Sequence, residues 1–225
     1  MRVVIKVTGK LFNPENREKL KGFIHVLKKL INDGHKLVVV TGGGSVARSY
    51  IRLAKEFNAP NSWRDLLGIE ASRLNALLIA SALGDYVYSP IPRSVDEFLM
   101  AWSSGKVVVL GGLQPGQSTN AVAAVAAELI NADILINATT VDGVYDKDPN
   151  KYSDAKLLPR VTPLELKKIL NRQKIEAGKY ELLDPISIAI IERNRTKTVI
   201  VNGLKPSNII EVIEGKKIGT EIVFE

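Results

Sequence analysis

Short apolar runs alternate along the chain with longer segments in which apolar residues recur every three or four positions. Residues 2–8 are valine or isoleucine at most positions, which predicts a strand buried on both faces. Asn13 and Pro14 then signal a helix start, apolar residues follow at helical spacing as far as Ile31, and Gly34 ends the helix. Residues 36–41 form a second apolar run. A strand, a helix and a strand within about 40 residues predict a parallel βαβ unit with a right-handed crossover.

The alternation continues to the end of the chain. Further helices are predicted over residues 46–57, 62–83, 95–102, 121–130, 163–170, 185–193 and 206–214, and further strands over 86–89, 106–110, 134–138, 198–201 and 220–224. This pattern predicts a single α/β domain over residues 1–225, a three-layer αβα sandwich with a mostly parallel central sheet. The stretch from 139 to 162 reads as a loop, and loops of that length are often functional.

Composition excludes several classes of protein. The chain has no cysteine, which rules out disulfide scaffolds, thiol nucleophiles and thiolate metal sites. Its two histidines make a multi-histidine metal centre improbable, and no metal-ligating residues are assigned. The longest apolar stretch, residues 74–83, is too short to cross a bilayer, so we expect no membrane partner and a cytoplasmic location.

The net charge of +7 is unevenly distributed. Residues 1–60 contain 12 basic and 4 acidic residues, a net of +8, whereas residues 61–150 contain 5 and 10, a net of −5. Residues 151–225, with 14 basic and 10 acidic residues, contribute +4. Basic ends are compatible with nucleic-acid binding, with solvated helix faces or with a site for small polyanions.

Glycine-rich turns follow four of the predicted strands. They are Thr8-Gly9-Lys10, Thr41-Gly42-Gly43-Gly44-Ser45, the run from Gly111 to Thr119, and Thr139-Thr140-Val141-Asp142-Gly143. In an open α/β sheet, ligands bind beyond the carboxyl ends of the strands. The second and third turns each lead into a helix, and glycine at a helix N-terminus lets backbone amides approach phosphate. Two such turns suggest two phosphate groups held separately, as a donor and an acceptor require.

Neither standard nucleotide motif is present. Gly9-Lys10 is followed by Leu11 rather than serine or threonine, so the P-loop pattern fails. Residues 42–47 lack the final glycine of the dinucleotide fingerprint, which disfavours a nicotinamide enzyme. A small polyanion bound by glycine turns that follow neither of these two motifs remains compatible with the sequence.

Lys6 is the most informative single residue. A lysine inside an apolar strand is costly unless its ammonium reaches a partner or a ligand, although an edge strand would also tolerate it. Arg48 lies one helical turn after Gly44 and is either a second anion ligand or a solvated arginine.

Acidic and polar residues elsewhere allow similar alternatives. Asp142, Asp146 and Asp148 suit magnesium, ribose hydroxyls or a solvated turn. Asp65, Arg73 and Asn75 on an apolar helix indicate either a polar interface or an acceptor pocket.

Taken together, these motifs resemble the amino-acid kinase superfamily. The matching residues are 5–10, Thr41 to Ser45, Asp65-Leu66-Leu67-Gly68, the 111–119 run and the stretch Thr139 to Pro149. Within the superfamily the chain is most similar to the archaeal type of UMP kinase, and the resemblance covers essentially its whole length. It implies the amino-acid kinase fold, with an acceptor-binding part over about residues 1–130 and an ATP-binding part over about 131–225.

The resemblance implies transfer of the γ-phosphoryl group of ATP to UMP, with Mg²⁺, in a homohexamer built as a trimer of dimers and without a nucleic-acid partner. The residues it places against ATP are Lys6, Gly9, Lys10, Gly44, Arg48, Thr139, Tyr145 and Asp148. Those it places against UMP are Gly43, Asp65, Leu113, Gln114, Pro115, Gly116, Gln117, Ser118 and Thr119. Lys6, Lys10 and Arg48 are the implied catalytic residues. Such a reaction needs no protein nucleophile, because positioning and charge stabilisation carry most of it.

Two positions depart from the family pattern. Thr140 stands where relatives often carry asparagine or lysine and receives no role. Lys10 stands where bacterial relatives usually carry an acid.

Two rival functions are compatible with the same motifs. One is another small-molecule kinase of the superfamily, acting on isopentenyl phosphate, acetylglutamate or carbamate. The polar loop with Gln114 and Gln117 suits a base better than an isoprenoid, and His25 and His35 lie away from the expected pocket. The other is a nucleotide-binding sensor or storage protein without turnover, against which the presence of Lys6, Arg48 and Asp148 argues.

Overall fold

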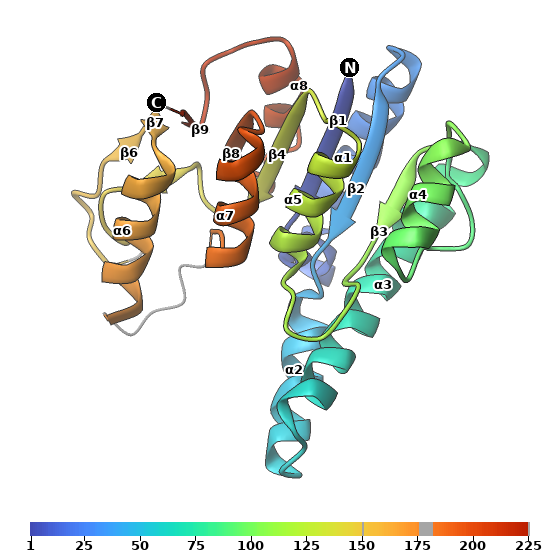
Figure 1. Ribbon diagram of the computed structural model, residues 1–225, viewed down its shortest axis with the longest axis horizontal. Helices are drawn as coiled ribbons and strands as arrows, with labels where there is room; N and C mark the ends of the chain where they lie inside the picture. The colour runs from blue at the N-terminus through green and yellow to red at the C-terminus, as the bar shows by residue number, and fades with distance from the viewer. Residues whose placement is uncertain (150, 176–181, 225) are drawn as a thin grey trace.

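A seven-stranded sheet with the order β3-β2-β1-β4-β8-β9-β7 forms the centre of the molecule (Figure 1). The computed structural model describes residues 1–149, 151–175 and 182–224, except for the side chains of 172–175. The strands of this sheet are β1 (Arg2–Val7), β2 (Lys36–Thr41), β3 (Val108–Leu110), β4 (Ile134–Thr139), β7 (Arg160–Val161), β8 (Thr198–Asn202) and β9 (Thr220–Ile222).

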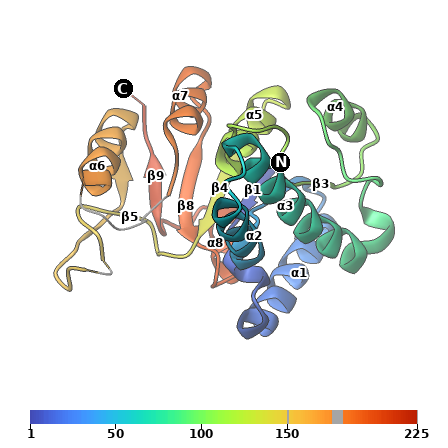
Figure 2. The ribbon, with the colours of Figure 1, turned by 90° about the horizontal axis from the view of Figure 1, so that it is seen from below.

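Eight helices connect these strands in the described part of the chain. They are α1 (Arg17–Asn32), α2 (Gly44–Glu56), α3 (Asn61–Leu83), α4 (Val95–Ser103), α5 (Thr119–Leu129), α6 (Pro163–Ile175), α7 (Pro185–Asn194) and α8 (Ser207–Ile213). The sheet lies between two layers of helices, with α5 and α7 over one face and α1 and α8 over the other (Figure 2). The predicted three-layer αβα sandwich is therefore confirmed.

Strand pairing confirms the mostly parallel sheet. β1 pairs in parallel with β2 on one side and β4 on the other, and β3 and β8 extend the parallel set. The β8–β9 pairing is antiparallel, and β7 pairs in parallel with β9, so β9 and β7 run opposite to the other described strands of this sheet. Because β1 is flanked on both sides, Lys6 lies in an interior strand, which rules out the edge-strand alternative.

Alternation along the strands divides the apolar core into two halves. Val4, Val38 and Leu135 pack under α5 and α7, whereas Val3, Ile5 and Val39 pack under α1, α3 and α8. Since neighbouring side chains of a strand point to opposite faces, Lys6 lies on the same face as Val4. That is the face covered by α5 and α7.

Some predicted elements differ from those observed. Two short 3₁₀ turns, Gly9–Phe12 and Pro14–Asn16, precede α1, so the first helix starts at Arg17 rather than at the proline. The strand predicted at 86–89 is reduced to an isolated bridge between Val87 and Val107, because a 3₁₀ turn at Gly84–Tyr86 leaves little length to pair.

The stretch predicted as one loop between 139 and 162 contains regular structure. β5 (Val144–Tyr145) pairs antiparallel with β6 (Leu157–Leu158), and β7 then joins the main sheet beside β9. These pairings span only two residues in each strand, which is too short for an alternating pattern to show in the sequence.

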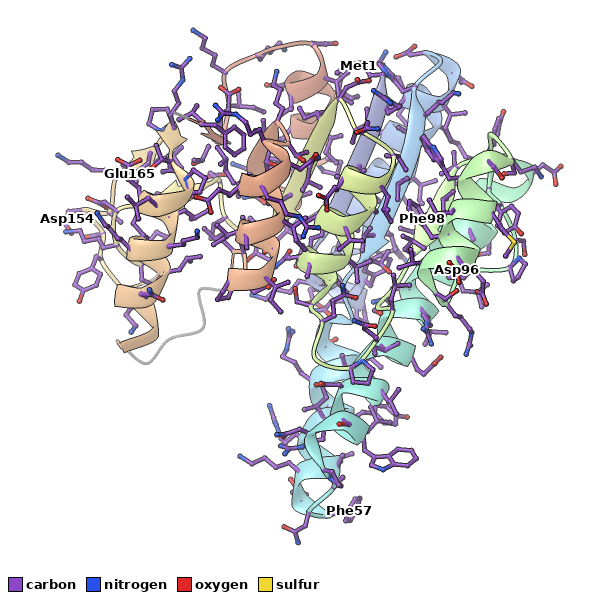
Figure 3. The ribbon with its side chains drawn as sticks, in the orientation of Figure 1. Met1, Phe57, Asp96, Phe98, Asp154 and Glu165 are labelled. Carbon is purple, nitrogen blue, oxygen red and sulfur yellow. The ribbon has the colours of Figure 1, made fainter. Side chains whose placement is uncertain are left out.

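Helices α2 and α3 project beyond the carboxyl ends of the strands, with Phe57 at their tip (Figure 3). The segment Asn61–Tyr86 is long and apolar enough to span a membrane by length and composition, and 39% of its most apolar window is buried within the protein. Ser72 and Asn75 on this helix are buried and bond to the backbone near the strand ends, so α3 forms a wall of the region described next.

Candidate functional site

The carboxyl ends of the central strands finish at one level. Val7 pairs with Thr41 of β2 and with Ala138 of β4. The pairing continues one residue further, since the Thr8 N–H donates to the Ala138 carbonyl at 2.9 Å and the Gly42 N–H to the Val7 carbonyl at 3.1 Å. The glycine turns that follow β1 and β2 therefore leave the sheet side by side.

Two of these turns touch through their backbones. A Cβ atom on Gly9 would lie 2.1 Å from the Gly44 nitrogen, and one on Gly44 would lie 2.3 Å from the Gly9 carbonyl oxygen. Gly44 also has a φ of +67°, which side chains disfavour. Only glycine fits at either position, and the junction lies at the N-terminus of α2, where backbone N–H groups and the helix dipole attract anions.

Buried polar residues hold the turn after β2 against α3. The Asn75 amide donates to the Gly42 carbonyl at 2.7 Å, and the Thr41 hydroxyl donates to the Ser72 carbonyl at 2.7 Å. Of the two alternatives for Asn75, the structure thus supports a polar contact with the glycine turn. The cost of burying these groups is offset because each is hydrogen-bonded.

The third glycine turn, loop 111–118, is fastened to the same helix. The Gly112 N–H donates to the Ser72 hydroxyl at 2.7 Å, and the Gly116 N–H donates to the Asp65 carboxylate at 2.9 Å. The Arg73 guanidinium, paired with Glu70 at 2.6 Å, also reaches the Leu113 carbonyl at 3.4 Å. Asp65, Ser72 and Arg73 thereby fix the loop opposite the Gly9–Gly44 junction.

Loop 111–118 and α3 enclose a pocket of about 360 Å³. Five residues proposed from the sequence for the acceptor line it: Asp65, Gly116, Gln117, Ser118 and Thr119. Leu113, Gln114, Pro115 and Gly43 are absent from the lining. Gly43 instead packs behind it, since a Cβ there would lie 2.5 Å from the Ala47 Cβ and 3.0 Å from the Gly68 carbonyl.

Five other residues with no sequence-based role also line this pocket: Ile51, Gly68, Ile69, Ser72 and Gly112. For Gly68, Ile69 and Ser72, the sequence contains a signal that could have identified them. Asp65, Gly68, Ile69 and Ser72 follow one another at intervals of three, one and three residues, which places them on one face of a helix. Ile51 comes from α2 and joins them only because α2 packs along α3.

The three candidate cations are placed differently. Lys6 lies near the end of β1, level with Val40 of β2 and Asn137 of β4. Lys10 is exposed just beyond Gly9, and the Thr8 hydroxyl accepts a hydrogen bond from its backbone N–H at 3.3 Å. Arg48 is exposed on the first turns of α2. All three therefore come from the elements that meet at the Gly9–Gly44 junction.

The residues predicted to contact the nucleoside of ATP lie at and beyond the end of β4. Thr139 ends β4 and is buried, and its carbonyl accepts a hydrogen bond from the Gly203 N–H at 2.7 Å. Tyr145 lies in β5, where burial and then the nearby Asp142 carboxylate raise the pKa of its phenol. Asp148 follows β5 and is buried.

Asp142 and Asp146 of the same stretch are hydrogen-bonded to protein groups. The Asn202 amide donates to Asp142 at 3.1 Å and lowers the pKa of that carboxyl, with the Lys205 ammonium at 3.2 Å as a further cause. The Asp146 carboxylate accepts from the Lys156 N–H at 2.8 Å. Within the residues that the structure describes, no three His, Cys, Asp or Glu side chains gather as a metal site.

Known proteins are similar to this chain over its full length. The sequence profile of the amino acid kinase family matches residues 1–202. The uridylate kinase of Sulfurisphaera tokodaii is 48% identical over 223 residues, 99% of each chain, and that of Hyperthermus butylicus is 49% identical over 220 residues, 98% of this chain and 97% of the other. The crystal structure of uridylate kinase from Archaeoglobus fulgidus matches with a TM-score of 0.88 at 36% identity, covering 99% of this chain and 100% of that one.

The Gly9–Gly44 contact generates a stability prediction. Gly9→Ala should lower the free energy of unfolding by about 1–3 kcal/mol, because the new methyl group overlaps backbone that has no room to move. Gly22→Ala is the matched control: Gly22 lies inside α1, and its Cβ would meet only Pro206 at 3.6 Å. There alanine should raise stability by about 0.5–1 kcal/mol through helix propensity. Urea unfolding of both variants measures the difference, and shifts of the same sign would contradict the argument.

Proposed function

The chain belongs to the amino acid kinase family, and from that premise we propose that it transfers the γ-phosphoryl group of ATP to UMP, giving UDP and ADP. The observation that carries the proposal is the pocket between α3 and loop 111–118, together with the Gly9–Gly44 junction at the N-terminus of α2. A nucleoside monophosphate needs both features: a polar pocket for base and ribose, and backbone N–H groups for phosphate.

Residue roles follow from the two sides of the site. On the ATP side, Lys6, Gly9, Lys10, Gly44 and Arg48 contact phosphates, and Thr139, Tyr145 and Asp148 contact the nucleoside. On the UMP side, Asp65 binds the ribose and residues 116–119 of the pocket hold the rest of the nucleotide, while Gly43 and residues 113–115, which do not line the pocket, support it from the adjoining turns. Asp65 already accepts one hydrogen bond from Gly116 through Oδ2, so its other oxygen is the one directed to a ribose hydroxyl.

Catalysis then depends on alignment and charge. The oxygen of the UMP phosphate attacks the γ-phosphorus of ATP in line with the departing ADP oxygen, and negative charge develops on the transferring group. The Lys6 ammonium stabilises that charge, with Lys10 and Arg48 beside it. No histidine or thiol takes part, which agrees with a chain that lacks cysteine and carries both histidines in or beside α1.

Mg²⁺ enters with ATP in this proposal. Magnesium usually keeps several waters and binds through substrate phosphates with one or two carboxylates. No grouping of three metal-ligating side chains occurs in the described residues, which fits a cation held chiefly by phosphate oxygens and water.

We also propose a cytoplasmic homohexamer, a trimer of dimers. One face of α3 leaves Leu74, Leu77 and Leu78 about half exposed or more, and a contiguous apolar surface of this kind usually contacts another chain. A second copy would bury these leucines. Sedimentation velocity measures the assembly directly, and a sedimenting monomer would contradict it.

The function is tested with purified protein, MgATP and a panel of acceptors in an assay for ADP release. We expect UMP to be phosphorylated well above CMP, AMP and isopentenyl phosphate. Preference for isopentenyl phosphate or acetylglutamate would identify another kinase of the family. Binding of nucleotides without ADP release would identify a sensor or storage protein.

Lys6→Ala should lower the turnover rate roughly 100- to 1,000-fold, the usual effect of losing one preorganised charge-stabilising donor. Lys36→Ala is a matched control, because Lys36 is an exposed lysine at the opposite end of the neighbouring strand β2. Steady-state kinetics and urea unfolding are measured for both. Near-normal turnover in folded Lys6→Ala would remove Lys6 from the mechanism.

Asp65→Asn should raise the Michaelis constant for UMP roughly 10- to 100-fold and that for ATP much less, since a hydrogen bond to a charged group contributes about 1.5–3 kcal/mol. The asparagine oxygen can still accept from Gly116, so the loop keeps its attachment. Asp85→Asn, exposed beyond the other end of α3, serves as control. Equal rises for both substrates would count against a ribose contact.

A further inference from the structure

We infer that Asp184, which has no assigned role, is a positioning residue that sets the acceptor loop relative to the ATP-binding half through its hydrogen bond with Ser118. The inference rests on the proposed function, because it concerns the alignment of that reaction. We call this contact the Ser118–Asp184 clasp.

The clasp joins the N-caps of two helices. The Ser118 hydroxyl donates to Asp184 Oδ2 and accepts from the Ala121 N–H at 3.0 Å, which caps α5. Asp184 Oδ1 accepts from the N–H groups of Ile186 and Ser187, both at 3.0 Å, which caps α7. Both carboxylate oxygens are thus engaged, one by each helix start, and α5 and α7 run side by side (Figure 1).

Two asparagines fasten the segment that leads to Asp184. The Asn137 amide of β4 donates to the Leu182 carbonyl at 2.8 Å, and the Asn120 amide of α5 donates to the same oxygen at 3.3 Å. Asn137 is fully buried and lies level with Lys6 in the adjacent strand. The start of α7 is therefore held from the loop, from α5 and from the strand beside the proposed catalytic lysine.

The position of the clasp explains what it does. Loop 111–118 is attached to α3 through Gly112 and Gly116, both contacts lying within the acceptor-binding part. The clasp joins this loop directly to the start of α7, an element of the part that the proposal assigns to ATP. Phosphoryl transfer requires the two substrates in near-attack geometry, and a misplacement of about 1 Å can cost 100-fold in rate.

A carboxylate suits this role better than an amide. Asp184 accepts three hydrogen bonds at once, whereas asparagine has a single acceptor oxygen. Asparagine is nevertheless a good N-cap, so Asp184→Asn retains the cap of α7 while removing the acceptor for the Ser118 hydroxyl. The variant therefore separates the clasp from the stability of the helix.

The experiment measures kcat and both Michaelis constants with MgATP and UMP for wild type, Asp184→Asn, Ser118→Ala and the double variant. We expect each single variant to lower kcat roughly 10- to 100-fold with little change in the Michaelis constant for ATP. The double variant should lose no more than the larger single loss, because both remove one interaction. Ser118→Thr, which restores a hydroxyl, should recover most of the rate lost in Ser118→Ala.

Ser94→Ala is the matched control for losing a serine N-cap. Ser94 caps α4 by accepting from the Glu97 N–H at 3.1 Å, and neither belongs to the proposed site. It should lower the melting temperature about as much as Ser118→Ala and leave kcat unchanged.

Multiplicative losses in the double variant, or a wild-type kcat in Asp184→Asn, would overturn the clasp. If Asp184→Asn does not fold, Ser118→Ala decides, since a kcat equal to that of Ser94→Ala would also overturn it. Failure of the wild type to phosphorylate UMP would instead overturn the proposed function, so the two failures are distinguishable.

Discussion

The close approach of Gly9 and Gly44 is the constraint on which the rest of the site depends. Two backbone segments from neighbouring strands occupy space that a single methyl group would fill. The contact brings the turn after β1 against the N-terminus of α2, where backbone N–H groups are available for an anion. Neither turn alone makes this site, because the amide groups converge only when both side chains are missing.

Around that contact, buried polar groups supply the rigidity that glycine lacks. Asn75 of α3 bonds to the turn after β2. Ser72 and Asp65 of the same helix bond to Gly112 and Gly116 of loop 111–118. A helix that is apolar enough to span a membrane by length and composition thus owes its place in the fold to a few polar residues. Its polar side lines the pocket beside loop 111–118, and its residues Leu74, Leu77 and Leu78 are left exposed.

In the proposed reaction, the acceptor-binding and ATP-binding parts have separate tasks and must be held in alignment. Phosphoryl transfer asks for little covalent chemistry from the protein but for accurate placement of two anions. Strand pairing of β1 with β4 aligns the halves at the level of the sheet. The Ser118–Asp184 clasp aligns the two parts beyond the sheet, at the residue where loop 111–118 joins α5. An excess of positive charge in the first 60 residues then favours two small nucleotides over one long polyanion, since Lys6, Lys10 and Arg48 all lie near the glycine junction.

The sequence by itself determined the αβα architecture and most strand and helix positions, because apolar periodicity and glycine punctuation are local signals, whereas the interior position of β1 followed from its pairing with β2 and β4. Through the resemblance to the family it also indicated Gly43, Asp65 and residues 113–119 as one acceptor site, and of these Asp65 and residues 116–119 line one pocket. The roles proposed for the ATP side remain predictions. Only the tertiary structure decided that Ile51 joins the pocket, that Leu113, Gln114 and Pro115 do not line it, and that Ser118 meets Asp184. The reason is physical: Ser118 and Asp184 are 66 residues apart, and their contact arises from the packing of α5 against α7, for which no local pattern exists.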